Sequence, residues 1–168
     1  LTQWAKRLGA VTIGTVGSPE KAQLARDHGL DHAILYKNQD FVAATRALTD
    51  GKGVDTAFDG IGGETLPRTL DCVRPFGLVA SIGQAGGPIA PIPVGEIGPR
   101  RSLAFSRPSV FAYAADIQSY TEAAQALFVM LADGLTLTLG TQYALADAAR
   151  AHQDMQSGRT TASPLLVA

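Results

Sequence analysis

Apolar residues along the chain follow two spacings, which together predict strands that alternate with helices. Short runs rich in branched apolar residues predict strands at 11–16, 33–36, 55–61, 77–83, 102–108, 135–145 and 164–168. Helical spacing predicts helices at 1–8, 18–28, 40–50, 64–73, 116–132 and 147–156. Ser18 and Asp40 stand where N-caps are expected, and a Pro/Gly-rich loop is expected over 84–99.

This alternation favours an α/β fold, with a parallel sheet covered by helices on both faces. In such sheets, ligands bind at the carboxyl ends of the strands. We therefore expect the informative positions to follow the strands, at 17–18, 36, 59–62, 81–86 and 105–109. The strand at 102–108 is expected at an edge of the sheet.

Composition narrows the class of partner. The chain has 168 residues, 46% hydrophobic and 17% charged, enough for one domain with a sizeable core. A net charge of −1 without a basic patch argues against a nucleic-acid or anionic-membrane partner. No apolar run approaches the ~20 residues of a membrane span. The chain has a single cysteine, Cys72, which excludes an intramolecular disulfide and is expected in the core. Without a signal peptide, a cytoplasmic location is expected.

Four segments carry a resemblance, in order and spacing: QWAKRLGAVTIGTVGSPEKAQLARDHGLDHAILY, FDGIGGETLPRTLDCVRPFGLVASIGQAGGP, SRPSVFAY and AARAHQDMQSGRTT. They resemble the cofactor-binding half of NADPH-dependent quinone oxidoreductases, the zinc-free, zeta-crystallin-like branch of the medium-chain dehydrogenase/reductase superfamily. The resemblance covers essentially the whole chain. It implies an oxidoreductase that transfers hydride from NADPH to a small-molecule quinone or activated alkene; an enoyl or enone reductase of the same superfamily is the alternative. It also implies a homodimer through the edge strand near Ser102 to Arg107.

The resemblance also predicts a Rossmann-like doubly wound sheet that lacks its first strand and glycine-rich loop. On this interpretation, residues 1–134 form an N-terminally truncated NADP-binding domain, and 135–168 form a segment that in the family returns to the catalytic domain. The missing strand would sit between the second and fourth strands. Its loss would leave two interior edges with unpaired backbone groups, unless a neighbouring chain, a rearrangement or preceding residues fill the place.

The loop after the first predicted strand is the main candidate for reading the adenosine ribose. An NAD-specific site would carry Asp or Glu at the strand end, where this chain has Gly17. Ser18 and Lys21 at the following helix start suit a 2′-phosphate, and the family uses matching positions in this way. The alternative is that Ser18 is only an N-cap and Lys21 a surface lysine. Glu20 would repel a phosphate, and we expect it to point to solvent.

The later strand ends supply the remaining candidates, whose cofactor contacts are implied by the resemblance. Tyr36 would pack near the adenosine phosphate, or be an edge-strand aromatic with its hydroxyl in water. The backbone of Asp59 and Gly62 would lie beside the cofactor. The alternative for Asp59 is that its side chain only accepts hydrogen bonds from local amides in a turn. The loops that would meet the nicotinamide contain Ile82, Gly83, Phe105 and Arg107.

Two arginines carry open interpretations, and no residue stands out as a catalytic proton donor. Arg107 could instead make a structural hydrogen bond to neighbouring carbonyls. Arg159 resembles a family arginine near the cofactor phosphates. The histidines do not have metal-ligand spacing, so no metal site is expected; they are His28, His32 and His152. Two hypotheses for this chain remain: the cofactor-binding part of an enzyme, inactive if isolated, or a self-associating structural module.

Overall fold

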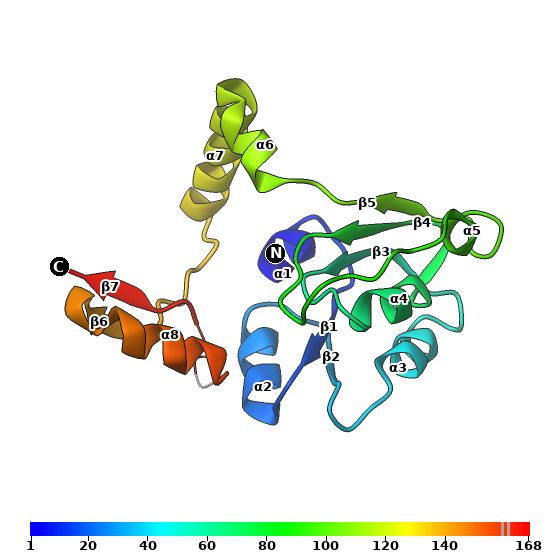
Figure 1. Cartoon of the computed structure of the whole chain (residues 1–168), viewed down its shortest axis with the longest axis horizontal. Coiled ribbons are helices and arrows are strands. Elements are labelled where there is room, and N and C mark those ends of the chain that lie inside the picture. The colour runs from blue at the N-terminus through cyan, green and yellow to red at the C-terminus, as the bar shows by residue number, and fades with distance from the viewer. Residues whose placement is uncertain (159, 161) are drawn as a thin grey trace.

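The structure is a computed structural model that describes residues 1–158, 160 and 162–168; Arg159 therefore lies outside the described residues. Helices and strands alternate through most of the chain (Figure 1). The helices are α1 (Thr2–Arg7), α2 (Pro19–Asp27), α3 (Phe41–Leu48), α4 (Thr65–Leu70), α5 (Val94–Ile97), α6 (Val110–Ala115), α7 (Ile117–Ala132), the 3₁₀ turn η1 (Leu145–Asp147) and α8 (Ala148–Gln156). The strands are β1 (Ile13–Val16), β2 (His32–Leu35), β3 (Val54–Asp59), β4 (Val73–Ser81), β5 (Ala104–Ser106), β6 (Gln142–Ala144) and β7 (Leu165–Val167).

The strands form three separate parallel sheets in the described part of the chain. β1 pairs with β2, the order β3-β4-β5 forms the second sheet, and β6 pairs with β7. β5 lies at an edge, as the sequence predicts. β1 and β3 do not pair, so the two interior edges expected from the sequence are present among the described strands.

Packing links the first two sheets although their strands do not pair. Ile34 of β2, Phe41 of α3 and Cys72 share one buried cluster. A second cluster joins α4 to the following strand; its buried members are Leu66, Leu70, Val73 and Val79. Because Cys72 ends the α4 turn and directly precedes β4, the two clusters adjoin along the chain. The expectation that Cys72 is a core residue is confirmed.

Side-chain caps begin several helices where the sequence places them. The Ser18 hydroxyl accepts a hydrogen bond from the Lys21 amide at 3.3 Å, and Pro19 occupies the first turn of α2. The Asp40 carboxylate accepts from the amides of Val42 and Ala43 at 2.8 and 3.1 Å, which begins α3. These caps satisfy amide groups that have no partner within the helix.

Other sequence predictions are wrong in detail. The alternating run at 135–145 is not one strand: only Gln142–Ala144 pair, and Leu137 and Leu139 are exposed, because alternation without a partner strand does not form a sheet. The helix predicted at 64–73 ends earlier, since β4 already begins at Val73. β4 then bulges between its first and later pairings with β3 before the regular strand. The short helices α5 and α6 were not predicted.

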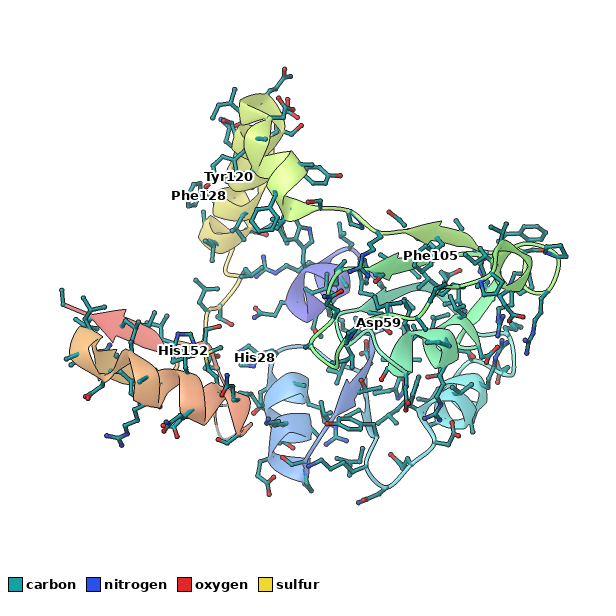
Figure 2. All side chains as sticks on the ribbon, in the orientation of Figure 1. His28, Asp59, Phe105, Tyr120, Phe128 and His152 are labelled. Carbon is teal, nitrogen blue, oxygen red and sulfur yellow. The ribbon has the colours of Figure 1, made fainter. Side chains whose placement is uncertain are left out.

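The α6–α7 pair projects from the sheets on an extended connection (Figure 1). Large apolar side chains on α7 are unburied: Tyr120 and Phe128 are 56% and 66% exposed, and both stand on this pair in Figure 2. Beyond it, the chain returns to the first sheet. His28, which ends α2, bonds Thr138 Oγ1 at 2.8 Å. No helix among the described residues combines the length and apolarity that a bilayer-spanning segment needs.

Candidate nucleotide-binding site

The carboxyl end of β1 brings a hydroxyl, a cation and an aromatic ring into one region. Gly17 follows β1, and a Cβ there would lie 3.2 Å from the Tyr36 hydroxyl, so the glycine lets the ring approach the turn. Tyr36, which follows β2, is 51% exposed. The Lys21 ammonium lies one turn into α2 and donates to the Gly158 carbonyl at 3.2 Å. The structure thus brings Gly17, Ser18, Lys21 and Tyr36 together.

Glu20 lies beside this group. Its side chain is exposed, as expected, and a hydrogen bond from the Ser18 side chain is the main reason that the pKa of the Glu20 carboxyl is lowered. The ionised carboxylate therefore competes for the same hydroxyl that a phosphate would use. A phosphate bound here would be attracted by Lys21 and repelled by Glu20.

Asp59 ends β3 and organises the turn that follows. Its Oδ1 accepts from the amides of Ile61 and Gly62 at 2.9 and 2.7 Å, and its Oδ2 accepts from the Thr69 hydroxyl of α4 at 2.6 Å. The side chain is only 4% exposed. Two of these partners are amides of the following turn and the third is a hydroxyl on α4, so the side chain of Asp59 holds the turn and no acid–base function follows from its contacts.

The turns after β3 and β4 press against each other through glycines. Gly62 has φ +65°, and a Cβ there would lie 2.9 Å from Gln84 Cα. At Gly83 a Cβ would lie 2.7 Å from the Gly60 carbonyl oxygen. Both contacts involve backbone atoms, which cannot rotate away. Side chains at these positions would force the two turns apart, so the glycines fix the shape of this strand-end surface.

Arg107 follows β5 and joins that strand end to β4. Its guanidinium donates to the buried Ser81 hydroxyl at 3.2 Å and to Gln84 Oε1 at 2.8 Å. Phe105 of β5 packs against the core cluster around Leu66, while Ile82 is 54% exposed beside the turn. Asp59 and Phe105, labelled in Figure 2, come from the two outer strands of this sheet.

The predicted residues thus form two groups. One lies after β1 and β2, and the other lies after β3, β4 and β5, with Asp59 and Phe105 contributing side chains to the scaffold. Gln84 was not singled out from the sequence, although its loop was; its partner Arg107 lies 23 residues away and no local pattern marks the pair. No group of three or more His, Cys, Asp or Glu side chains in the described part of the chain is placed to bind a metal.

Parallel strands whose carboxyl ends carry glycine turns, a capped helix start and a nearby cation define a nucleotide-binding α/β domain. Residues 1–129 match the zinc-binding dehydrogenase family, and the chain belongs to that family. This match agrees with the resemblance found in the sequence segments, because relatives similar to this chain include quinone oxidoreductases and a 2-haloacrylate reductase.

Three relatives place the chain within the family. It is 40% identical to a quinone oxidoreductase of Pseudomonas aeruginosa over 98% of this chain and 51% of the relative. It is also 40% identical to a 2-haloacrylate reductase of a Burkholderia species, over 99% and 51%. The structure superposes on the Escherichia coli quinone oxidoreductase solved with NADPH at a TM-score of 0.92, with 37% identity, covering 99% of this chain and 52% of that one. The chain has the Rossmann-like fold and spans about half the length of these relatives.

Proposed function

We propose that this chain is the cofactor-binding part of an NADPH-dependent quinone oxidoreductase. The observation that carries the proposal is the arrangement after β1: Ser18 and Lys21 begin α2, and Gly17 stands where an NAD-specific site would carry a carboxylate. Family membership and the NADPH complex of the E. coli relative support it. Reduction of an activated alkene is the second candidate, favoured by the 2-haloacrylate reductase relative.

In this proposal the two groups of residues hold the two ends of the cofactor. Lys21 exchanges the Gly158 carbonyl for the 2′-phosphate, and Ser18 and the first amides of α2 complete the anion site. The turns after β3, β4 and β5 take the nicotinamide end, on a surface whose shape Gly62 and Gly83 fix by letting two of the turns pack closely. The cofactor itself supplies the hydride, and the protein contributes position and exclusion of water.

The wider assignments belong to the same proposal. We keep residues 1–134 as the cofactor domain and 135–168 as a segment that joins another domain. A homodimer through β5 is supported by the position of that strand at a sheet edge, where backbone groups can pair with a second copy. Light scattering that shows only monomer across a concentration series would refute it. The single buried thiol is compatible with a cytoplasmic location, which cell fractionation tests.

Binding measurements on the Lys21→Ala variant test the proposal. Removing one charged contact to a phosphate weakens NADPH binding by roughly 10- to 100-fold. NADH lacks the 2′-phosphate, so its dissociation constant stays unchanged. Lys52→Ala, at an exposed lysine in the turn before β3, is the matched control and leaves both constants unchanged.

Equal losses for NADPH and NADH in Lys21→Ala would mean that the lysine does not read the 2′-phosphate. If the chain binds neither nucleotide and instead self-associates through the unpaired edges of β1 and β3, the structural-module alternative is correct. In a protein that carries this chain together with a catalytic domain, quinone-dependent and haloacrylate-dependent oxidation of NADPH distinguish the two candidate reactions.

A further inference from the structure

A cavity of about 340 Å³ lies along the outer edge of β2. Figure 1 shows α2 and α3 on either side of this strand, and both helices contribute to the wall of the cavity. Its volume is within the range of small-molecule sites, and it shares no residue with the candidate nucleotide-binding site. The lining residues are Arg26, His32, Ala33, Ile34, Gln39, Ala44, Ala47 and Leu48.

The outer edge of β2 offers free backbone groups at one residue. The amides of His32 and Tyr36 donate to carbonyls of β1 and its preceding residue, so in this parallel ladder Ala33 and Leu35 direct their backbone groups outward. Leu35 is already satisfied, because its amide donates to Gln39 Oε1 at 2.9 Å and its carbonyl accepts from the Gln39 amide at 3.0 Å. An added strand needs alternate residues along an edge. Since Gln39 closes the edge beyond Ala33, the cavity suits a small molecule and not an extended peptide.

Two basic residues stand at the mouth of the cavity. Arg26 and His32 are exposed, and neither side chain has a hydrogen-bond or ion-pair partner among the residues that the structure describes. The carboxylates next to them in sequence are engaged elsewhere: Asp27 accepts from a glutamine of the same helix at 2.8 Å, and Asp31 is paired with Lys6. None of the lining residues is acidic. The mouth therefore favours an anion.

The interior of the cavity is apolar. Ile34, which is 2% exposed, forms its floor, and Ala44 and Leu48 of α3 form the wall on that side. His32 and Ile34 alternate onto one face of β2, and Ile34 packs against Phe41, so this face is the one that α3 covers. A ligand that fits must carry an apolar body next to its charged group.

We propose that this cavity binds a small monocarboxylic acid with an apolar body. The carboxylate lies beside Arg26 and His32, the amide of Ala33 is a further donor, and the body packs on Ile34 and Ala44. Inorganic phosphate lacks the body, and a primary amine has the wrong charge. The inference does not rest on the proposed function, because the cavity lies outside the residues assigned to the nucleotide.

Hexanoate, hexanol and hexylamine test the ligand class, because they share one apolar body and differ in the head group. Amide chemical shifts measured by NMR should place hexanoate at Ala33 and its neighbours, with a dissociation constant of about 1–10 mM. Hexanol should bind more weakly by roughly threefold or more, and hexylamine should leave these amides unshifted. Acetate should bind more weakly than hexanoate, because it buries less apolar surface.

Two pairs of variants test the residues. Arg26→Gln should weaken hexanoate binding roughly two- to fivefold without changing hexanol binding, whereas Arg100→Gln, at an exposed arginine outside the cavity, should change neither. Ala47→Leu enlarges an exposed side chain in the wall and should weaken both ligands. Ala43→Leu makes the same change at an exposed position of α3 that does not line the cavity, and it should leave both constants unchanged.

Several outcomes overturn the inference. Equal affinity for hexanoate and hexanol, or no effect of Arg26→Gln, would mean that the basic residues do not recognise a carboxylate. Shifts centred away from β2, or unchanged binding in Ala47→Leu, would place the ligand elsewhere. An acidic extended peptide that shifts the amides of Ala33 and Leu35 where hexanoate does not would show that the edge takes a strand instead. None of these results bears on NADPH binding, so the proposed function is tested separately.

Discussion

The contacts of Asp59 make a strong prediction about stability. Its carboxylate is buried at the end of β3 and accepts from Ile61, Gly62 and Thr69. Asp59→Ala removes all of these acceptors at once, while Asp59→Asn keeps one oxygen for the two amides. The comparison of the two variants therefore measures the acceptors rather than the volume of the side chain.

The expected magnitude follows from the donors left behind. Thr69 Oγ1 already lies 3.2 Å from the Thr65 carbonyl, so its hydroxyl has a second acceptor. The amides of Ile61 and Gly62 have no such alternative among their contacts within the turn, and each unsatisfied donor costs about 1–3 kcal/mol. Asp59→Ala should lower the free energy of unfolding by roughly 3–5 kcal/mol, and Asp59→Asn by about 1 kcal/mol.

Urea unfolding followed by circular dichroism measures both values. Thr69→Val serves as the control, because it removes one donor and keeps the shape of the side chain; it leaves one oxygen of the buried carboxylate without this partner and should cost about 1.5–3 kcal/mol. In the double variant Asp59→Ala/Thr69→Val the losses should fall short of additivity, because both changes remove the same hydrogen bond. If Asp59→Ala lies within about 1 kcal/mol of wild type, or if Asn is as damaging as Ala, the acceptor argument is wrong.

Four further predictions test single features. Gly83→Ala should destabilise the chain by about 1–3 kcal/mol in urea unfolding, since its Cβ would meet the Gly60 carbonyl; a neutral effect would contradict the close approach. The Lys6 ammonium holds the pKa of Asp31 at about 2, against 3.8 ordinarily, so this carboxylate stabilises the fold above pH 4 and loses that contribution between pH 4 and 2. The free energy of unfolding of Asp31→Asn should therefore depend less on pH in that window than that of the wild type. Burial raises the pKa of the Cys72 thiol, so a disulfide reagent at pH 8 should label the chain only after unfolding, and fast native labelling would refute this. Glu20→Gln should tighten NADPH binding about two- to fivefold without changing NADH binding; titrations that show no difference would mean that the carboxylate lies outside the phosphate site.

Local chemistry made part of the fold predictable. Ser18 and Asp40 were recognisable as caps because a cap needs only a short polar side chain before a helical pattern. The strands of the first two sheets were recognisable because branched apolar residues recur in them; Ile34, Val73 and Val79 are buried, while Ile13 and Val16 of β1 are partly buried. The run at 135–145 failed for a tertiary reason: Leu137 and Leu139 alternate like a strand, but a strand exists only where a partner pairs with it.

The candidate site likewise contains residues that could be recognised from local sequence and residues whose contacts depend on the fold. Gly17, Ser18 and Lys21 are neighbours in sequence, so their combination is recognisable from the order of residues alone. Gln84 and Arg107 could not be paired in that way, because their contact depends on β4 and β5 lying side by side. The bond from Lys21 to Gly158 spans 137 residues and depends on the return of the chain to α2.

That difference determines how the two ends of the proposed cofactor site respond to substitution. In the proposal, the β1 end binds through a charge and a hydroxyl at a capped helix start, so single changes at Lys21 or Glu20 should alter the preference between NADPH and NADH without disturbing the sheet. The β3–β5 end would use turns held by Asp59, Gly83 and Arg107, so most changes there should alter stability and binding together. Substitutions among the residues that hold the turns therefore report on the shape of this end of the site, whereas substitutions at Lys21 and Glu20 report on the charge of the other end.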